Sequence, residues 1–183
     1  MITLASTSPQ RRAILEQLGL PFEVVEPAYD EGARPGATPV EHAQAKARSV
    51  PGDLVLGVDT TVVLDGETLG KPVDAAEASW MLGRLAGRTH EVVSGLCLVT
   101  PEWEESAEAV TRVTFRPVGA DDLAAYVASG EWEGRAGAYA IQGRGAALVE
   151  RIEGDYLNVV GLPAAALLGI LDRRFPATGP APG

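Results

Sequence analysis

An aspartate that follows a short apolar run carries the most specific chemistry in this sequence. The segment Gly57-Val58-Asp59-Thr60-Thr61 places a carboxylate at the expected end of a buried strand. Ligands in α/β sheets commonly bind at such strand ends. The carboxylate could hold Mg²⁺ or orient a water molecule. An aspartate that only caps a turn explains the same pattern, so the residues alone leave both interpretations open.

A second candidate site joins an expected strand to the start of a helix at Ser6-Thr7-Ser8-Pro9-Gln10-Arg11-Arg12. The free N–H groups and the dipole of a helix N-terminus favour an anion. Hydroxyl and guanidinium groups would add donors to phosphate oxygens. The alternative is an ordinary capped helix whose arginines are solvated.

Two glycine-containing segments could also contact a ligand. Gly70-Lys71-Pro72 combines a small residue with a point charge that suits phosphate. Residues 135–145 contain three glycines and Gln142, whose amide could read the edge of a base. A solvated turn lysine and a mobile surface loop are the corresponding alternatives.

The charge balance limits the classes of partner. The 183 residues include 15 basic and 25 acidic side chains, which gives a net charge of −10. This charge opposes nonspecific binding to nucleic acid or to an anionic membrane. A polyanionic ligand would need a local positive pocket. Only two of the basic residues are lysines, Lys46 and Lys71, against 13 arginines. Genome bias accounts for this ratio, yet it draws attention to both lysines.

The sequence favours a cytoplasmic protein. No run approaches the ~18 apolar residues that a membrane span requires, and no signal peptide is visible at the N-terminus. The single cysteine, Cys97, lies in an apolar run and excludes an intrachain disulfide. We expect it to be a core thiol.

The hydrophobic pattern predicts a mixed sheet flanked by helices. Helix starts are marked by Ser8-Pro9, by a capping box at Thr38 and Glu41, and by Pro163. Asp65-Gly66 predicts a hairpin. The expected strands are 2–5, 54–58 (ending at Asp59), 61–64, 67–69, 91–99, 109–118 and 146–152; the expected helices are 9–18, one from 39 that carries Lys46, 74–87, 120–129 and 163–174; and a disordered tail is expected over 176–183.

Six blocks taken together resemble the Maf family of nucleoside triphosphate pyrophosphatases. In order they are Leu4-Ala5-Ser6-Thr7-Ser8-Pro9, Gly57-Val58-Asp59-Thr60, Gly70-Lys71-Pro72, Thr89-His90-Glu91-Val92, Gly137-Ala138-Tyr139-Ala140-Ile141-Gln142-Gly143 and Asn158-Val159-Val160-Gly161-Leu162-Pro163. The resemblance implies an α/β fold of the Maf and ITPase type, in which an elongated twisted mixed sheet and its helices form two lobes around a nucleotide cleft. It implies one domain over residues 1–175 and a homodimer.

The resemblance also implies an activity and a set of site residues. The activity is hydrolysis of a nucleoside triphosphate to the monophosphate and pyrophosphate with a divalent cation, Mg²⁺ or Mn²⁺, and members are linked to septum formation. By motif, Asp59 is the catalytic proton acceptor and, with Glu31, a metal ligand. The residues that match the phosphate-binding positions are Ser8, Arg11, Lys46 and Lys71.

Three positions bear on the choice of base. Thr60 and Gln142 match the subgroup that prefers dTTP and UTP, whereas Gln10 matches neither the Arg of that subgroup nor the Trp of the 7-methyl-GTP subgroup. The alternatives are therefore a 7-methyl-GTP pyrophosphatase of the same family and a non-catalytic nucleotide-binding regulator of cell division. Haloacid-dehalogenase phosphatases also place an Asp after an apolar strand, but Thr61 stands where they have a second Asp.

Overall fold

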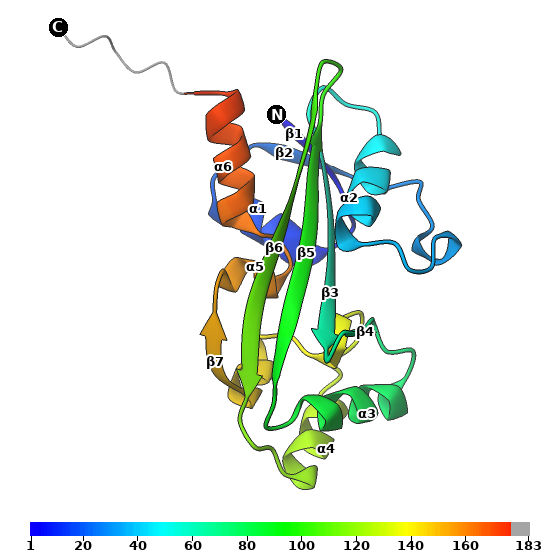
Figure 1. Cartoon of the computed structure of the whole chain (residues 1–183), viewed down its shortest axis with the longest axis vertical. Helices are drawn as coiled ribbons and strands as arrows, with labels where there is room; N and C mark the ends of the chain where they lie inside the picture. The colour runs from blue at the N-terminus through cyan, green and yellow to red at the C-terminus, as the bar shows by residue number, and fades with distance from the viewer. Residues whose placement is uncertain (177–183) are drawn as a thin grey trace, which may run out of the picture.

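The long strands of a single mixed sheet run through the whole length of the protein (Figure 1). The computed structural model describes residues 1–176. The strands are β1 (Ile2–Ala5), β2 (Phe22–Val25), β3 (Val55–Leu64), β4 (Glu67–Leu69), β5 (Thr89–Val99), β6 (Glu104–Phe115) and β7 (Val149–Glu153). The helices are α1 (Pro9–Gln17), α2 (Pro39–Arg48), α3 (Ala75–Leu85), α4 (Ala120–Ala128), α5 (Tyr156–Val160) and α6 (Ala164–Arg174), with 3₁₀ turns η1 (Glu31–Ala33), η2 (Ala136–Ala138) and η3 (Gly143–Leu148).

The sheet joins two lobes. Its order is β2-β1-β3-β5-β6-β7, with β4 paired to β3; β1 is parallel to β2 and β3, and the remaining pairs are antiparallel. Helices α1, α2 and α6 lie around the upper half of the long strands in Figure 1, and α3 and α4 lie at the lower end. This arrangement confirms the expected mixed α/β fold with an elongated sheet flanked by helices.

Each lobe has its own apolar core. In the upper lobe, α1 and α6 pack on one face of the sheet around Leu4, Leu56 and Leu98. In the lower lobe, α3, α4 and η2 enclose a core that includes Leu82 and Phe115. A third cluster, in which Cys97 is buried as expected, forms where α2 covers the other face of the upper sheet. Burial raises the pKa of the Cys97 thiol to about 11.

The strand expected to stop at Asp59 is longer than the sequence indicated. Strand β3 is continuous from Val55 to Leu64, and Asp59 pairs with Gly95 of β5 in the middle of the ladder. The polar residues from Asp59 onward break the apolar pattern because their side chains face the space between the lobes, not because the strand ends. The expected ligand position at a strand end is therefore wrong: Asp59 lies mid-strand.

Other boundaries shift by smaller amounts. The strand expected over 109–118 runs from Glu104 to Phe115, because its first residues pair with β5 up to Val99. The strand expected over 146–152 begins at Val149, because residues 143–148 form the 3₁₀ turns of η3. Strand β2 and the short helix α5 were not expected from the sequence. The capping box at Thr38 and Glu41 is confirmed. The expected disordered tail falls, apart from Pro176, outside the described residues. Within residues 1–176, no helix is both long and apolar enough to cross a membrane.

Two glycines allow α2 to lie directly on the sheet. A Cβ added at Gly57 would lie 2.0 Å from the Ala43 carbonyl oxygen, and one at Gly95 would lie 2.3 Å from the backbone of Pro39 and Val40. Both are backbone contacts that cannot be relieved by turning a side chain. Glycine, which has no Cβ, is therefore required at the two points where α2 crosses β3 and β5.

Gly57→Ala should lower the free energy of unfolding by about 1 to 3 kcal/mol, because the added methyl group must push α2 away from the sheet. Chemical denaturation measures this change. The control is Gly83→Ala on α3, where an added Cβ meets nothing within 4 Å. It should leave stability unchanged or raise it by up to about 1 kcal/mol, since alanine favours helix. Equal effects of the two substitutions would contradict the tight contact.

Candidate active site

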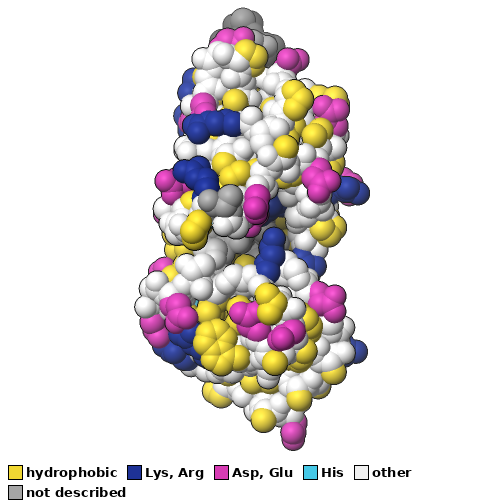
Figure 2. Space-filling view, turned by 90° about the vertical axis from the view of Figure 1, so that its right-hand side faces the viewer, with side chains coloured by type: hydrophobic (Ala, Val, Ile, Leu, Met, Phe, Trp, Pro, Cys, Tyr) yellow, Lys and Arg dark blue, Asp and Glu magenta, His cyan; other side chains and the backbone are white. Residues whose placement is uncertain are grey.

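A cleft of about 630 Å³ lies between the lobes, and its lining combines residues from both. In the space-filling view of Figure 2 the molecule is hollowed at mid-height, with dark-blue basic side chains beside the hollow. The lining includes every site residue predicted from the sequence: Ser8, Gln10, Arg11, Glu31, Lys46, Asp59, Thr60, Lys71 and Gln142. Segments more than a hundred residues apart in the chain thus meet in one cavity.

A buried lysine joins the two acidic residues of the cleft. The Nζ atom of Lys46 lies 2.6 Å from Asp59 Oδ1 and 2.6 Å from a carboxylate oxygen of Glu31. Lys46 reaches Asp59 because α2 lies directly against β3. Burial alone would raise the pKa of Glu31, but the hydrogen bond and charge of Lys46, together with the charge of Lys71, outweigh it and lower that pKa. The group is therefore a fixed carboxylate–ammonium–carboxylate arrangement.

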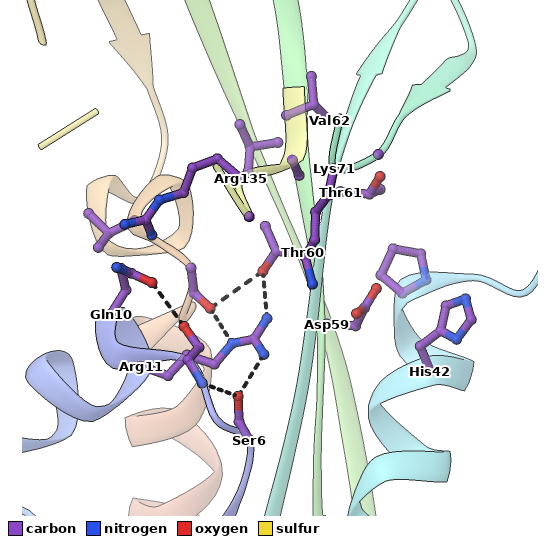
Figure 3. Close-up of a pocket in the computed structure, with 18 of the residues that line it drawn as sticks. Ser6, Gln10, Arg11, His42, Asp59, Thr60, Thr61, Val62, Lys71 and Arg135 are labelled. Carbon is purple, nitrogen blue, oxygen red and sulfur yellow. Dashed lines mark hydrogen bonds between the residues drawn. The ribbon is translucent and has the colours of Figure 1, made fainter. Parts of the chain in front are cut away.

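Arg11 lies beneath the cleft and joins three elements (Figure 3). Its Nε donates to the Gly161 carbonyl at 3.0 Å, one terminal nitrogen donates to Ser6 Oγ at 3.0 Å, and the other lies 3.5 Å from Thr60 Oγ1. Burial lowers the pKa of Arg11, and the charges of Asp59 and Glu31 partly offset that effect. A guanidinium has five N–H donors, so Arg11 retains donors for a bound anion while it holds the walls of the cleft together.

The Thr60 hydroxyl is also engaged within the protein. It shares a 2.8 Å hydrogen bond with the hydroxyl of Ser94 on β5 and approaches the Gly161 carbonyl at 3.4 Å. A hydroxyl has one donor and two acceptor positions. Thr60 therefore has little hydrogen-bonding capacity left for a ligand, and it influences the cleft mainly through Arg11.

The start of α1 presents polar groups from the upper lobe. Ser8 is the N-cap residue, as predicted, but its hydroxyl does not cap the helix; it donates to Gln10 Oε1 at 3.1 Å. On the opposite wall, Lys71 is exposed at the end of the β3–β4 hairpin and makes no ion pair within residues 1–176. The cleft thus combines a helix N-terminus with a free ammonium group.

The segment that carries Gln142 is fixed by two tyrosines. The hydroxyl of buried Tyr139 lies 2.8 Å from Nε2 of His90, and the Tyr126 hydroxyl accepts a 3.0 Å hydrogen bond from the backbone N–H of Ala140. Burial raises the pKa of Tyr139. The structure does not show the alternative of an irregular surface loop over residues 135–145. This segment contains the 3₁₀ turn η2 and the start of η3, and the two tyrosine hydroxyls link it to the rest of the lower lobe. Gln142 itself is exposed at the rim of the cleft.

A family match agrees with this geometry. The family of Maf-like proteins matches residues 1–174. The chain belongs to the Maf family. The predicted resemblance is therefore confirmed over almost the whole chain.

Three curated relatives that are similar to this chain have the same name. The protein of Symbiobacterium thermophilum is 51% identical, with 88% of both chains covered. That of Nitratidesulfovibrio vulgaris is 51% identical over 94% of this chain and 87% of its own, and that of Anaeromyxobacter sp. is 47% identical over 100% and 94%. Each is named a dTTP/UTP pyrophosphatase. The solved Ham1 protein of Staphylococcus aureus is a weak likeness, with a TM-score of 0.44 at 15% identity over 62% of this chain and 71% of that chain.

The carboxylates of this Maf-family cleft fit a divalent cation that is shared with a substrate. Within residues 1–176 no three His, Cys, Asp or Glu side chains gather as a complete metal cage. Asp59 and Glu31 nevertheless converge on one cation, the ammonium of Lys46, at 2.6 Å each. Mg²⁺ is usually bound through one or two carboxylates plus substrate phosphates. The donor set suits a metal that arrives with a triphosphate.

Sequence reasoning missed several residues that shape the Maf-family site. Ser6, Ser94 and Gly161 hold Arg11 and Thr60, and Arg135 enters the cleft from the lower lobe. Ser6 lies inside the first candidate motif, so its neighbourhood was identified. Gly161 lies in the last of the six family blocks, and Arg135 opens the candidate segment 135–145, but neither was assigned a role from the sequence. Ser94 carries no local signal, because it reaches Thr60 only through the pairing of β3 with β5.

Buried His90 should make the stability of the protein depend on pH. Burial lowers the pKa of His90 from 6.5 to about 4. The unfolded chain therefore binds the proton first, and stability falls as the pH drops from about 6.5 to about 4, by an amount on the order of 3 kcal/mol. His90→Gln keeps a polar partner for Tyr139 without titrating. Denaturation curves at several pH values should show that the variant loses less free energy of unfolding than the wild-type protein between about pH 6.5 and pH 4. An equal loss in both proteins would show that His90 is not the source of the pH dependence.

Proposed function

We propose that this Maf-family protein hydrolyses dTTP and UTP to the nucleoside monophosphate and pyrophosphate. The observation that carries the proposal is that the Asp59–Lys46–Glu31 group lies in a cleft that is also lined by the start of α1 and by Lys71. The names of the relatives agree with this nucleoside triphosphate pyrophosphatase activity. The closest competing activity is 7-methyl-GTP hydrolysis.

The triphosphate binds at the basic end of the cleft. Lys46 and Lys71 supply point charges, and the unpaired N–H groups at the start of α1 donate to phosphate oxygens. Ser8 and the remaining donors of Arg11 complete the cradle. This concentration of positive charge is what a protein of net charge −10 needs in order to bind a polyanion.

Asp59 is the proton acceptor for the attacking water. As the water oxygen bonds to the α-phosphorus, its proton passes to the Asp59 carboxylate and the bond to the bridging oxygen breaks. Pyrophosphate leaves with that electron pair, and Lys46 and Lys71 stabilise its charge. Fixed charges of this kind act without reorganising during the reaction.

Asp59 and Glu31 would hold the divalent cation, Mg²⁺ or Mn²⁺. When bound, the metal neutralises charge that develops on the phosphates. Lys46 contacts both carboxylates at 2.6 Å, and it lowers the pKa of Glu31. The chain would thus supply two carboxylate ligands, and substrate phosphates would supply others.

Base choice is assigned to Gln142, Gln10 and Thr60. Gln142 offers a donor and an acceptor to a pyrimidine edge. Thr60 acts by fixing Arg11 and the floor of the cleft. A base with the wrong pattern leaves polar groups unpaired, which strongly disfavours its binding.

The cellular setting follows from the same proposal. We place the enzyme in the cytoplasm as a homodimer of one-domain chains, where it removes excess or modified pyrimidine triphosphates, without nucleic acid or membrane as a partner. Any link to septum formation would follow from this nucleotide hydrolysis.

One assay tests the proposal. Purified protein with Mg²⁺ or Mn²⁺ is given dTTP, UTP, CTP and 7-methyl-GTP, and the products are separated. We expect monophosphate plus pyrophosphate, fastest from dTTP and UTP. Orthophosphate release would indicate a phosphatase, preference for 7-methyl-GTP would indicate the other subgroup, and binding without turnover would indicate a regulator.

A further inference from the structure

Arg135 differs from every other partly buried arginine within residues 1–176. Four arginines are neither exposed nor fully buried: Arg11, Arg84, Arg116 and Arg135. Arg11 donates to Gly161, Arg84 pairs with Glu67 at 2.7 Å, and Arg116 donates to the Ala147 carbonyl at 2.6 Å. The side chain of Arg135 has no such partner among the described residues, and its buried Nε makes no hydrogen bond. A buried donor without an acceptor is costly, so this guanidinium is suited to an acceptor on a ligand.

The side chain of Arg135 crosses the cleft. Its backbone immediately precedes η2 in the lower lobe, and the side chain lines the same cavity as Asp59. In Figure 3 it extends toward Gln10 at the start of α1, and Lys71, Asp59 and His42 lie on the other side of the view. Arg135 and Gln10 thus lie on one side of the cleft, and Lys71 and Asp59 lie on the other. Ser8, which donates to Gln10 Oε1, is the point at which the proposed phosphate cradle meets the Arg135 side.

The two sides differ in chemistry. Asp59, Glu31, Lys46 and Lys71 form a highly charged side that suits metal and phosphates. The Arg135 side brings together a guanidinium and the amide of Gln10, whose Oε1 accepts from Ser8 and whose NH₂ group is unengaged in the described structure. Under the proposed function, on which this inference rests, a triphosphate anchored at the charged side directs its base toward Arg135.

We propose that Arg135 donates a hydrogen bond to the 4-carbonyl oxygen of uracil or thymine. Arginine carries donors and no acceptor. Thymine and uracil present a carbonyl acceptor at position 4, whereas cytosine presents an amino donor there. The same guanidinium therefore binds dTTP or UTP and disfavours CTP, so Arg135 is a specificity-determining residue.

The test compares substrates in the variant Arg135→Met, which keeps much of the side-chain volume and loses the donors. We expect kcat/KM for UTP to fall about 10- to 100-fold, the range of one specific base contact. The value for CTP should change by less than about threefold, since cytosine lacks the acceptor. Wild-type protein should also use 4-thio-UTP less well than UTP, because sulfur is the weaker acceptor, and Arg135→Met should lose that distinction.

The matched control is Arg144→Met, an exposed arginine in the following segment that does not line the cleft. It should keep wild-type kinetics, and equal unfolding temperatures would show that both variants are folded. Equal losses for UTP and CTP in Arg135→Met would mean that the arginine binds phosphate, and no loss would mean that it contacts no substrate; either result overturns the inference and leaves the proposed activity standing. Failure of the wild-type protein to release pyrophosphate from UTP would overturn both.

Discussion

Asp59→Asn should reduce turnover of dTTP and UTP by about a thousandfold, because a positioned general base contributes on the order of 10² to 10⁴ in rate. Asparagine keeps the shape of the side chain and can still accept a hydrogen bond from Lys46. It cannot accept the proton of the attacking water, and it removes one ionic ligand for the metal. Steady-state kinetics with pyrophosphate detection measures the effect.

The fold should survive this change. Lys46 retains Glu31 as a partner at 2.6 Å, so its ammonium does not become an isolated buried charge. The control is Asp65→Asn on the same hairpin, where the exposed carboxylate pairs with Arg88. We expect that variant to keep full activity, because exposed ion pairs contribute little. An Asp59→Asn enzyme that turns over at the wild-type rate would refute the role of this carboxylate.

The sequence predicted most elements of the fold because local signals dominate them. The capping box at Thr38, the hairpin residues Asp65-Gly66 and Pro163 each act within a few residues. The two strands predicted over 54–58 and 61–64 are one strand, β3, because the polar residues Asp59 and Thr60 interrupt the apolar pattern without ending the strand. Only the pairing with β5 reveals that these residues line a cleft in the middle of a ladder.

The residues that the sequence singled out do line one cleft, but the sequence did not predict the contacts between them. Family motifs placed Lys46 and Asp59 in one site, but their direct pairing depends on how closely α2 approaches the sheet. That approach requires two small residues, Gly57 and Gly95, that lie on different strands. Arg11 could be expected near phosphate, yet its contact with Gly161 joins positions 150 residues apart. Long-range contacts of this kind leave no periodic trace in the sequence.

The two lysines of this lysine-poor sequence both lie in the candidate site. Both lysines, Lys46 and Lys71, line the cleft. Their environments differ, since the Lys46 side chain is only 7% exposed and Lys71 is exposed. Under the proposed function, the buried ammonium of Lys46 organises the two carboxylates before substrate binds, whereas the solvated ammonium of Lys71 acts mainly on the bound phosphates. Replacing Lys46 should therefore have the larger effect on kcat, and replacing Lys71 should act more on KM.

Lys46→Met should lower kcat/KM by about a hundred- to a thousandfold, comparable to the loss of one preorganised donor at a developing charge. The substitution also removes the ammonium group that Asp59 and Glu31 both contact at 2.6 Å. Lys46 lowers the pKa of Glu31 in the wild-type protein, so its removal should raise that pKa and move the acidic limb of the pH–rate profile to higher pH. Arg173→Met, which removes an exposed partner of Glu105 far from the cleft, should leave both kinetics and profile unchanged.

The stability of Lys46→Met gives a second and independent readout. Because Glu31 of the folded variant binds a proton more tightly than Glu31 of the folded wild-type protein, acid stabilises the variant relative to the wild-type protein. The difference in free energy of unfolding should therefore be large at pH 8 and should shrink toward pH 5. A difference that does not depend on pH would show that Lys46 contributes only packing. In that case the carboxylate–ammonium–carboxylate group would not be the electrostatic centre of the site.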